Sequence, residues 1–140
     1  MWRWRSLYQQ VQDVPGKLDH REDKSRSYDG QYQPSHAITL VEDETVRGWA
    51  GGAEVMVNSL HGQGADRLAE GLEPLAYAPD GTIEMVRISA ARTFAYGTQF
   101  HPEYQSWEIR SMTPFLRLLA LPVSSEIAQE AYKNAKTDNL

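Results

Sequence analysis

Hydrophobic and polar positions alternate along the middle of the chain, and this pattern predicts a strand-rich body. Residues 35–41 (SHAITLV), 54–58 (EVMVN) and 93–100 (TFAYGTQF) alternate as half-buried strands do. Residues 75–78 and 82–88 flank Pro79-Asp80-Gly81, which has the composition of a hairpin turn. We therefore expect several strands, two of them joined as a hairpin.

The segments around this body are less regular. An apolar stripe over residues 4–11 fits a helix that Pro15 ends, and a strand over the same residues is left open. The polar residues 17–34 predict a long surface loop, and residues 59–66 (SLHGQGAD) predict another. Residues 42–44 and 51–52 interrupt the pattern between the strands. Near the C-terminus, Thr113-Pro114 predicts a helix start and residues 125–136 a last amphipathic helix.

Composition limits the partners that the chain can have. The net charge of −5, from 19 acidic and 14 basic residues, argues against nucleic acid, which requires clustered lysine and arginine. The longest apolar run, residues 118–123, is far shorter than the roughly 20 residues of a membrane helix. The start MWRWRS lacks the apolar core of a secretory signal, so we expect a cytoplasmic protein. With no cysteine among 140 residues, the chain can form no disulfide and offers no thiol nucleophile.

The residues with chemical potential lie in FHPEY, residues 100–104. Residues two apart on a strand point to the same side, so the Glu103 carboxylate can accept a hydrogen bond from one imidazole nitrogen of His101. That bond fixes the tautomer and leaves the other nitrogen free to move a proton. A strand cap with a surface ion pair explains the same residues, and spacing alone does not decide between the two. H-x-E is too short for a metal signature, and we find neither cysteine nor clustered histidine to extend it, so we expect no metal site.

The order of several motifs resembles the γ-glutamyl-γ-aminobutyrate hydrolase branch of the class I glutamine amidotransferase superfamily. LYQQV, DHRED, YQPSHAITL, VNSLHGQG, APDGTIEMV and YGTQFHPEY follow one another as in that family, over nearly all of residues 6–140. The resemblance implies an α/β fold: the C-terminal half of a class I glutamine amidotransferase-like, flavodoxin-like three-layer domain that lacks the N-terminal strands and the nucleophile elbow. In that fold, helices cover both faces of a mostly parallel sheet. We expect residues 1–140 to be one partial domain, with a non-family start (1–5), a strand-rich body (6–121) and a C-terminal helix and tail (122–140).

The resemblance also implies a Cys-His-Glu triad that hydrolyses a γ-glutamyl amide through a thioester. His101 matches the histidine that activates the thiol, and Glu103 matches the carboxylate that orients it. The substrate would be a small γ-glutamyl compound of polyamine breakdown, and no cofactor is expected. Four residues are candidates for shaping the γ-glutamyl pocket, although they could also serve only the turn: Asn58, Ser59, His61 and Gln63. We expect His36 to be packed structurally and His20 to be solvated.

The chain departs from the family pattern at its start. The family carries its nucleophile in a G-x-C-R-G-x-Q turn upstream of LYQQV, and MWRWR replaces small residues and a paired glycine found there. Our hypothesis is that an out-of-frame start or an upstream insertion or deletion explains this, which the DNA upstream of Met1 would test. Without the thiol and its oxyanion donors we expect the chain to be inactive alone. Missing strands and helices predict a homo-oligomer, or a chain that requires a separate N-terminal half.

Three interpretations remain open from the sequence. The first is a truncated γ-glutamyl hydrolase that retains His101 and Glu103. The second is a non-catalytic binding or scaffold remnant of the same fold. The third is the glutaminase half of an amidotransferase.

Overall fold

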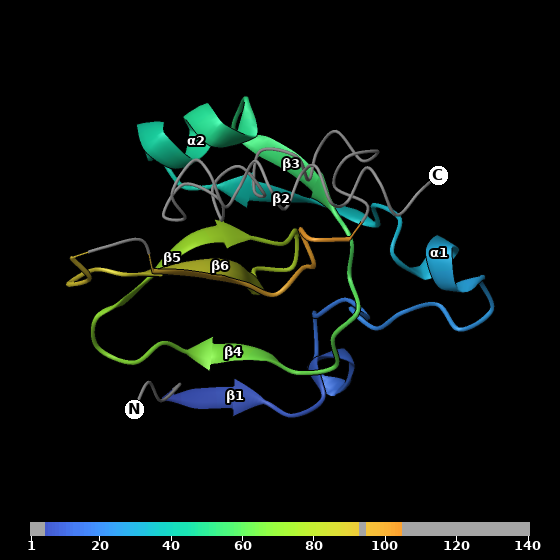
Figure 1. Ribbon diagram of the computed structural model, residues 1–140. Coiled ribbons are helices and arrows are strands. Elements are labelled where there is room, and N and C mark those ends of the chain that lie inside the picture. Colours follow the sequence, from blue (N-terminus) through green and yellow to red (C-terminus); the bar gives the residue numbers. More distant parts are fainter. Residues whose placement is uncertain (1–4, 93–94, 105–140) are drawn as a thin grey trace.

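The computed structural model describes residues 5–92 and 95–104, which form a seven-stranded sheet with two short helices (Figure 1). The sheet order is β1-β4-β6-β5-β2-β3, and β7 pairs with β6. The strands are β1 (Ser6–Tyr8), β2 (His36–Leu40), β3 (Glu54–Val57), β4 (Gly64–Arg67), β5 (Leu72–Tyr77), β6 (Ile83–Ile88) and β7 (Tyr96–Thr98). The helices are α1 (Tyr28–Gln31) and α2 (Glu44–Ala50), and Val11–Asp13 form the 3-10 turn η1.

Strands dominate this α/β chain, and every pairing among the described residues is antiparallel. Antiparallel pairs need no crossover helix. Parallel strands, which the three-layer domain would contain, are therefore not part of the described sheet. No helix within these residues is long and apolar enough to cross a bilayer.

The predicted hairpin is confirmed as β5 and β6. Its turn is closed by the Ala78 amide, which donates to the Thr82 carbonyl at 2.8 Å, and by the Gly81 amide, which donates to the Ala78 carbonyl at 2.9 Å. Gly81 has φ of 78°, a left-handed conformation that glycine adopts without a steric cost. The turn composition therefore identified the right connection.

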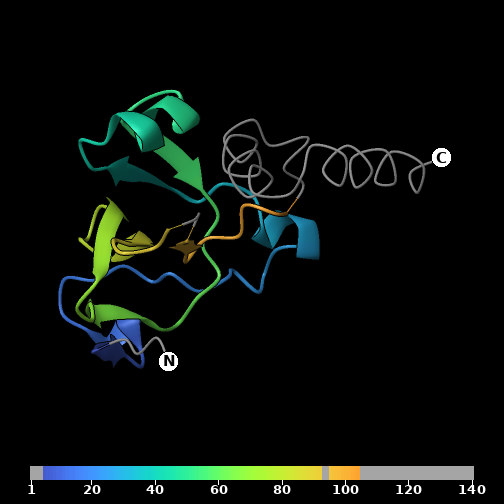
Figure 2. The same ribbon diagram turned by 60° about the vertical axis from the view of Figure 1, so that its left-hand side comes forward.

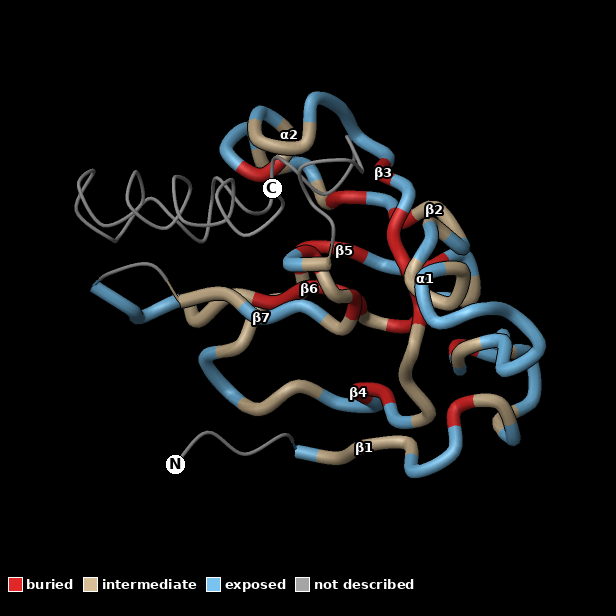
Figure 3. Tube along the Cα trace, turned by 45° about the vertical axis from the view of Figure 1, so that its right-hand side comes forward, coloured by how far each residue is buried: buried red, intermediate tan, exposed pale blue. Residues whose placement is uncertain are grey.

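The core lies between the central strands and α2. Alternation along β2 buries Ile38 and Leu40, and alternation along β3 buries Val55 and Val57, as the sequence pattern predicted. Val46 of α2 is fully buried against the same cluster. Figure 3 shows buried residues concentrated along β2, β5 and β6.

Helix α2 is an element that the sequence reading missed. Two of the interrupting residues, Asp43 and Gly51, are its caps. The Asp43 carboxylate accepts from the Thr45 and Val46 amides, both at 3.0 Å. Gly51 ends the helix with φ of 79°, and its amide donates to the Arg47 carbonyl. Seven residues are too few to show a clear apolar period, so only the caps could have predicted the helix.

The two predicted loops also contain regular structure. Near the start of the chain, Ser6–Tyr8 form β1 and Val11–Asp13 form η1. The strand alternative was therefore the better one at Ser6–Tyr8. Loop 59–66 ends in β4, which pairs with β1. Loop 17–34 contains α1, whose N-cap Ser27 accepts from the Gly30 amide. The predicted strand 93–100 is shorter, as β7, and the helices predicted from residue 113 onward lie outside the described residues.

Candidate functional site

His101 and Glu103 lie in a turn that follows β7, not on the strand end that their spacing suggested. The predicted contact is nevertheless present, with His101 Nδ1 2.8 Å from Glu103 Oε1. The carboxylate accepts from Nδ1–H, so Nε2 is the ring nitrogen left to move a proton. The His101 side chain is 42% exposed and that of Glu103 63% exposed, which makes the pair accessible to a substrate or a partner segment.

Asn58 fixes the main chain of His101. This side chain is fully buried at the end of β3, and its Oδ1 accepts from the His101 amide at 2.7 Å. Its Nδ2 donates to the His101 carbonyl at 3.0 Å. Phe100 and Pro102 are buried on either side of His101. The backbone amide and the backbone carbonyl of His101 are thus both hydrogen-bonded, which fixes the point from which the imidazole extends.

A tyrosine cluster lies beside the imidazole. Tyr32, which follows α1, meets His101 edge to face with 5.9 Å between ring centroids, and it stacks on Tyr104 at 4.1 Å. The Tyr104 hydroxyl donates to the Asp29 carboxylate, which raises the pKa of Tyr104 to about 12. In Figure 2 the orange segment after β7 runs to the side of the sheet where α1 lies. Helix α1 and its flanks therefore form one wall of the site.

The other predicted pocket residues are bonded to residues other than His101 and Glu103. The Ser59 hydroxyl donates to the His20 carbonyl at 2.7 Å, and the His61 amide donates to the same carbonyl at 3.0 Å. The Gln63 side chain donates to the Gln9 side chain at 2.9 Å. A direct role of these residues in binding substrate stays a prediction.

A largely buried group of histidines and carboxylates includes His61 of the loop at residues 59–66. His20, expected to be solvated, is only 1% exposed, and its Nε2 lies 2.8 Å from Asp80 Oδ2. Glu84 on β6 is also 1% exposed. Its Oε1 lies 3.5 Å from His20 Nδ1, 3.4 Å from His36 Nε2 and 3.5 Å from His61 Nε2. The expectation that the chain has no clustered histidine is therefore wrong, because the fold unites segments that are far apart in sequence.

The charges in this group shift one another's titration. Burial raises the pKa of Glu84, but His36 and His61 outweigh it, and the pKa lies below its usual value. Burial lowers the pKa of His61, but Glu84 outweighs it and the pKa is raised. One signal could have revealed the group from sequence: Glu84 is a lone charge in the apolar strand TIEMV, and such a charge must find partners when buried.

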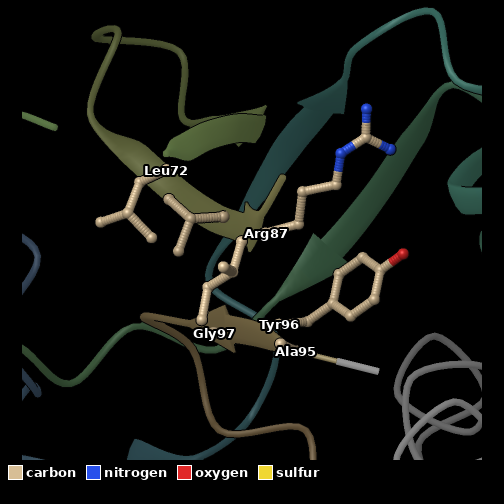
Figure 4. Close-up of a pocket in the computed structure, with 7 residues that line it drawn as sticks. Leu72, Arg87, Ala95, Tyr96 and Gly97 are labelled. Atoms are coloured by element: carbon tan, nitrogen blue, oxygen red, sulfur yellow. The ribbon is translucent and has the colours of Figure 1, made fainter. Parts of the chain in front are cut away.

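A shallow pocket of about 170 Å³ lies elsewhere, against β6 and β7 (Figure 4). Its lining is Leu72, Val86, Arg87, Ile88, Ala95, Tyr96 and Gly97. It includes neither His101 nor Glu103. In Figure 4 the Arg87 and Tyr96 side chains extend to the same side of these strands. Arg87 is already bonded to Glu73 and Asp43, each at 2.7 Å, so the pocket is not an obvious binding site for an anion.

A family model and several curated proteins match this chain. The Peptidase C26 family model matches residues 5–103. The gamma-glutamyl-gamma-aminobutyrate hydrolase PuuD of Escherichia coli (strain K12) is 38% identical over 104 residues, which are 74% of this chain and 41% of that protein. The "Putative glutamine amidotransferase-like protein YvdE" of Lactococcus lactis subsp. lactis (strain IL1403) is 31% identical over 102 residues, 73% of this chain and 39% of that protein.

The chain thus spans about two fifths of the length of these relatives. Among solved structures, a "putative gmp synthase subunit a protein" from Thermoplasma acidophilum superposes with a TM-score of 0.49 at 17% identity, over 79% of this chain and 51% of that chain. A likeness of this degree supports no inference by itself.

Proposed function

Because the chain belongs to the Peptidase C26 family, we propose that it carries the histidine–glutamate half of a thiol-dependent γ-glutamyl hydrolase. The observation that carries this proposal is the contact of His101 with Glu103, on a main chain held by Asn58. The E. coli relative is named for hydrolysis of γ-glutamyl-γ-aminobutyrate, and we infer a γ-glutamyl amide as the substrate class. The chemistry is hydrolysis of one C–N bond.

Each residue has a distinct role in the proposed reaction. A cysteine thiol gives its proton to His101 Nε2, and the sulfur attacks the γ-carbonyl carbon. The imidazolium then protonates the leaving amine, which departs as the thioester forms. Water, deprotonated by the same nitrogen, cleaves the thioester and releases glutamate. Glu103 is a positioning residue, since it holds the tautomer and stabilises the imidazolium without touching the substrate.

The thiol must come from outside these 140 residues, which contain no cysteine. We propose that the chain alone does not turn over, and that a cysteine-bearing N-terminal segment completes the site. The accessible side chains of His101 and Glu103 support this arrangement, since a second segment can reach them.

A fusion protein tests the proposal. The part of the E. coli relative that lies outside the match is joined to the N-terminus of residues 6–140, and hydrolysis of γ-glutamyl-p-nitroanilide is measured. We expect activity in the fusion and none in the chain alone. General acid–base catalysis contributes about 10²–10⁴-fold, so His101→Gln should lower kcat by that order. Glu103→Gln should lower kcat and shift its pH profile, whereas Glu54→Gln, an exposed glutamate of β3, is the matched control.

Three outcomes separate the alternatives. A folded fusion that binds γ-glutamyl compounds without hydrolysing them would favour a binding or scaffold protein. Hydrolysis of glutamine in strong preference to other γ-glutamyl amides would favour an amidotransferase half. Turnover by the 140-residue chain itself would contradict the proposed need for an external thiol.

A further inference from the structure

We propose that His20, His36 and Glu84 form a binding site for one divalent transition-metal ion, with zinc as the probe, and that His61 lies next to it as the fourth donor. The ligand atoms of the first three residues all lie within 4.8 Å of one another. They come from three separate parts of the chain: the loop before α1, strand β2 and strand β6. The site is independent of the proposed hydrolysis.

The distances suit a shared metal better than direct hydrogen bonds. Glu84 Oε1 is 3.4–3.5 Å from one nitrogen each of His20, His36 and His61. An N–H···O hydrogen bond is about 2.7–3.2 Å long, so these contacts are too long. Tetrahedral zinc with bonds of about 2.0–2.2 Å separates its ligand atoms by roughly 3.3–3.6 Å. Glu84 Oε1 therefore lies from all three nitrogens at about the distance expected for donors to one ion.

Four atoms of the group have no hydrogen-bond partner despite being buried. They are both carboxylate oxygens of Glu84 and the Nε2 atoms of His36 and His61. A buried carboxylate without hydrogen bonds is costly in a folded protein. A bound cation would satisfy this carboxylate and both nitrogens together.

Contacts outside the group indicate the tautomers of His20 and His61. His20 Nε2 lies 2.8 Å from Asp80 Oδ2, and a carboxylate can only accept, so this nitrogen carries the proton. His61 Nδ1 lies 2.7 Å from the Gln63 carbonyl, so it carries the proton there. In the neutral rings the nitrogens of His20 and His61 nearest Glu84 then present lone pairs to an anion, a repulsion that either a bound cation or an additional proton on the ring relieves.

Those same outer contacts are typical of metal sites. A histidine ligand commonly donates its second ring N–H to a carboxylate or a backbone carbonyl, which fixes the ring and raises its basicity. Asp80 does this for His20, and the Gln63 carbonyl does it for His61. The ligand set of imidazoles and one carboxylate suits zinc and its neighbours in the first transition row.

The site would have a structural role. The side chains of His36 and His61 are 13% and 11% exposed and that of Glu84 is fully buried, which leaves little room for a substrate. Ser59, which holds the His20 carbonyl, follows Asn58 directly in the chain. An ion here would fix the loop of residues 59–66, which directly follows Asn58, the residue that holds the main chain of His101.

Zinc binding to the complete 140-residue chain tests the proposal. Chain freed of metal with a chelator is titrated with zinc against a chromophoric competitor, and cobalt is added separately to record the absorption bands of a tetrahedral site. We expect one zinc per chain. His36→Gln and Glu84→Gln should each weaken binding more than Asp80→Asn, for which loss of an outer partner predicts about 10–100-fold. The matched controls are His101→Gln and Glu103→Gln, which make the same changes outside the group and should leave zinc affinity unchanged.

A second readout covers variants that fail to fold. Zinc added to the unaltered chain should shift the ring ¹⁵N resonances of His20 and His36 and leave those of His101 unchanged. Zinc should also raise the melting temperature, because a ligand that binds only the folded state stabilises it. The proposal is overturned if zinc leaves the His20 and His36 resonances unmoved. Equal affinity in the ligand variants and in the unaltered chain would overturn it as well, and the group would then be a network of ion pairs without metal.

Discussion

At the scale of single residues, the position of His101 depends on two independent kinds of contact. Its ring is held by Glu103, and its backbone amide and carbonyl are both bonded to the Asn58 side chain. Because Asn58 is fully buried, removing its amide would leave two backbone groups without these partners. The orientation of the ring and the place of the main chain can therefore be tested separately.

Replacement of Asn58 by alanine should loosen the turn that carries His101. Loss of a buried hydrogen-bonding partner typically costs about 1–3 kcal/mol, and we expect a fall of that size in the free energy of unfolding. Urea unfolding measures it. Gln63→Ala removes another amide side chain, at an exposed position, and should change stability by less than about 0.5 kcal/mol. Equal effects of the two substitutions would argue against the role given to Asn58.

At this scale the sequence could predict contacts between residues that are close in the chain, but not contacts between distant ones. His101 and Glu103 are two residues apart, so their contact is local and the pattern was enough. His20 and Asp80 are 60 residues apart, and their contact exists only once β5 and β6 are placed in the sheet. The burial of His20 was missed for that reason, and the partners of the lone charge Glu84 could not be named from its own strand.

At the scale of elements, alternation and turn composition predicted β2, β3 and the hairpin of β5 and β6. Strands β2 and β3 alternate buried and more exposed positions, so their period of two is visible in the sequence, whereas the hairpin was visible from the residues of its turn. Short elements with few buried residues gave no such signal. Strand β4 is the clearest case, because its pairing with β1 is what makes it a strand.

The cap of α2 predicts a dependence of stability on pH. Hydrogen bonds from the Val46 amide, together with Arg87, hold the pKa of Asp43 below its usual value of 3.8 despite the opposing effect of burial. A depressed carboxyl pKa contributes stability that is present above pH 3.8 and is lost as the pH falls through the lower, folded-state pKa.

Asp43→Asn should therefore be less stable than the unaltered chain at pH 6, and the difference should shrink as the pH falls below 4. Asn retains the cap, so the loss at pH 6 should stay below the roughly 1 kcal/mol expected for Asp43→Ala. Unfolding by urea at several pH values measures both. Glu54→Gln, an exposed change on β3, is the control, and a difference that grows in acid would contradict the argument.

Close packing between β4 and η1 predicts a coupling between two positions. A Cβ added at Gly64 would lie 2.8 Å from Val11 Cγ2, and Val11 is fully buried. Gly64→Ala should therefore destabilise by about 1–3 kcal/mol, as overpacking does. In a Val11→Ala background most of that extra cost should disappear, because the obstructing methyl group is gone. Strictly additive costs in the double-mutant cycle would show that the two positions do not touch.

At the scale of the whole molecule, the described sheet leaves strands at its ends without a second neighbour. In the sheet order, β1 and β3 are terminal, and Met56 of β3 is 44% exposed. Open strand edges can pair with other chains, and uncovered apolar side chains favour association. These features support the expected self-association.

We expect the purified chain to form a homo-oligomer, with β3 among the surfaces that meet. Met56→Lys should shift the molar mass measured by light scattering toward that of a monomer. Leu18→Lys is the matched control, since Leu18 is 45% exposed but lies in a loop. A well-behaved monomer of the unaltered chain at micromolar concentration would contradict this prediction.

The hydrogen bonds from Asn58 to the main chain of His101 have a practical consequence for spectroscopy. Within residue 101, the Asn58 side-chain amide bonds only the backbone. A different side chain can therefore be placed at position 101 without loss of these bonds. The sequence has no cysteine, so His101→Cys would introduce a unique attachment point for a fluorophore. Such a label would report, in real time and without any turnover, when another polypeptide covers this turn.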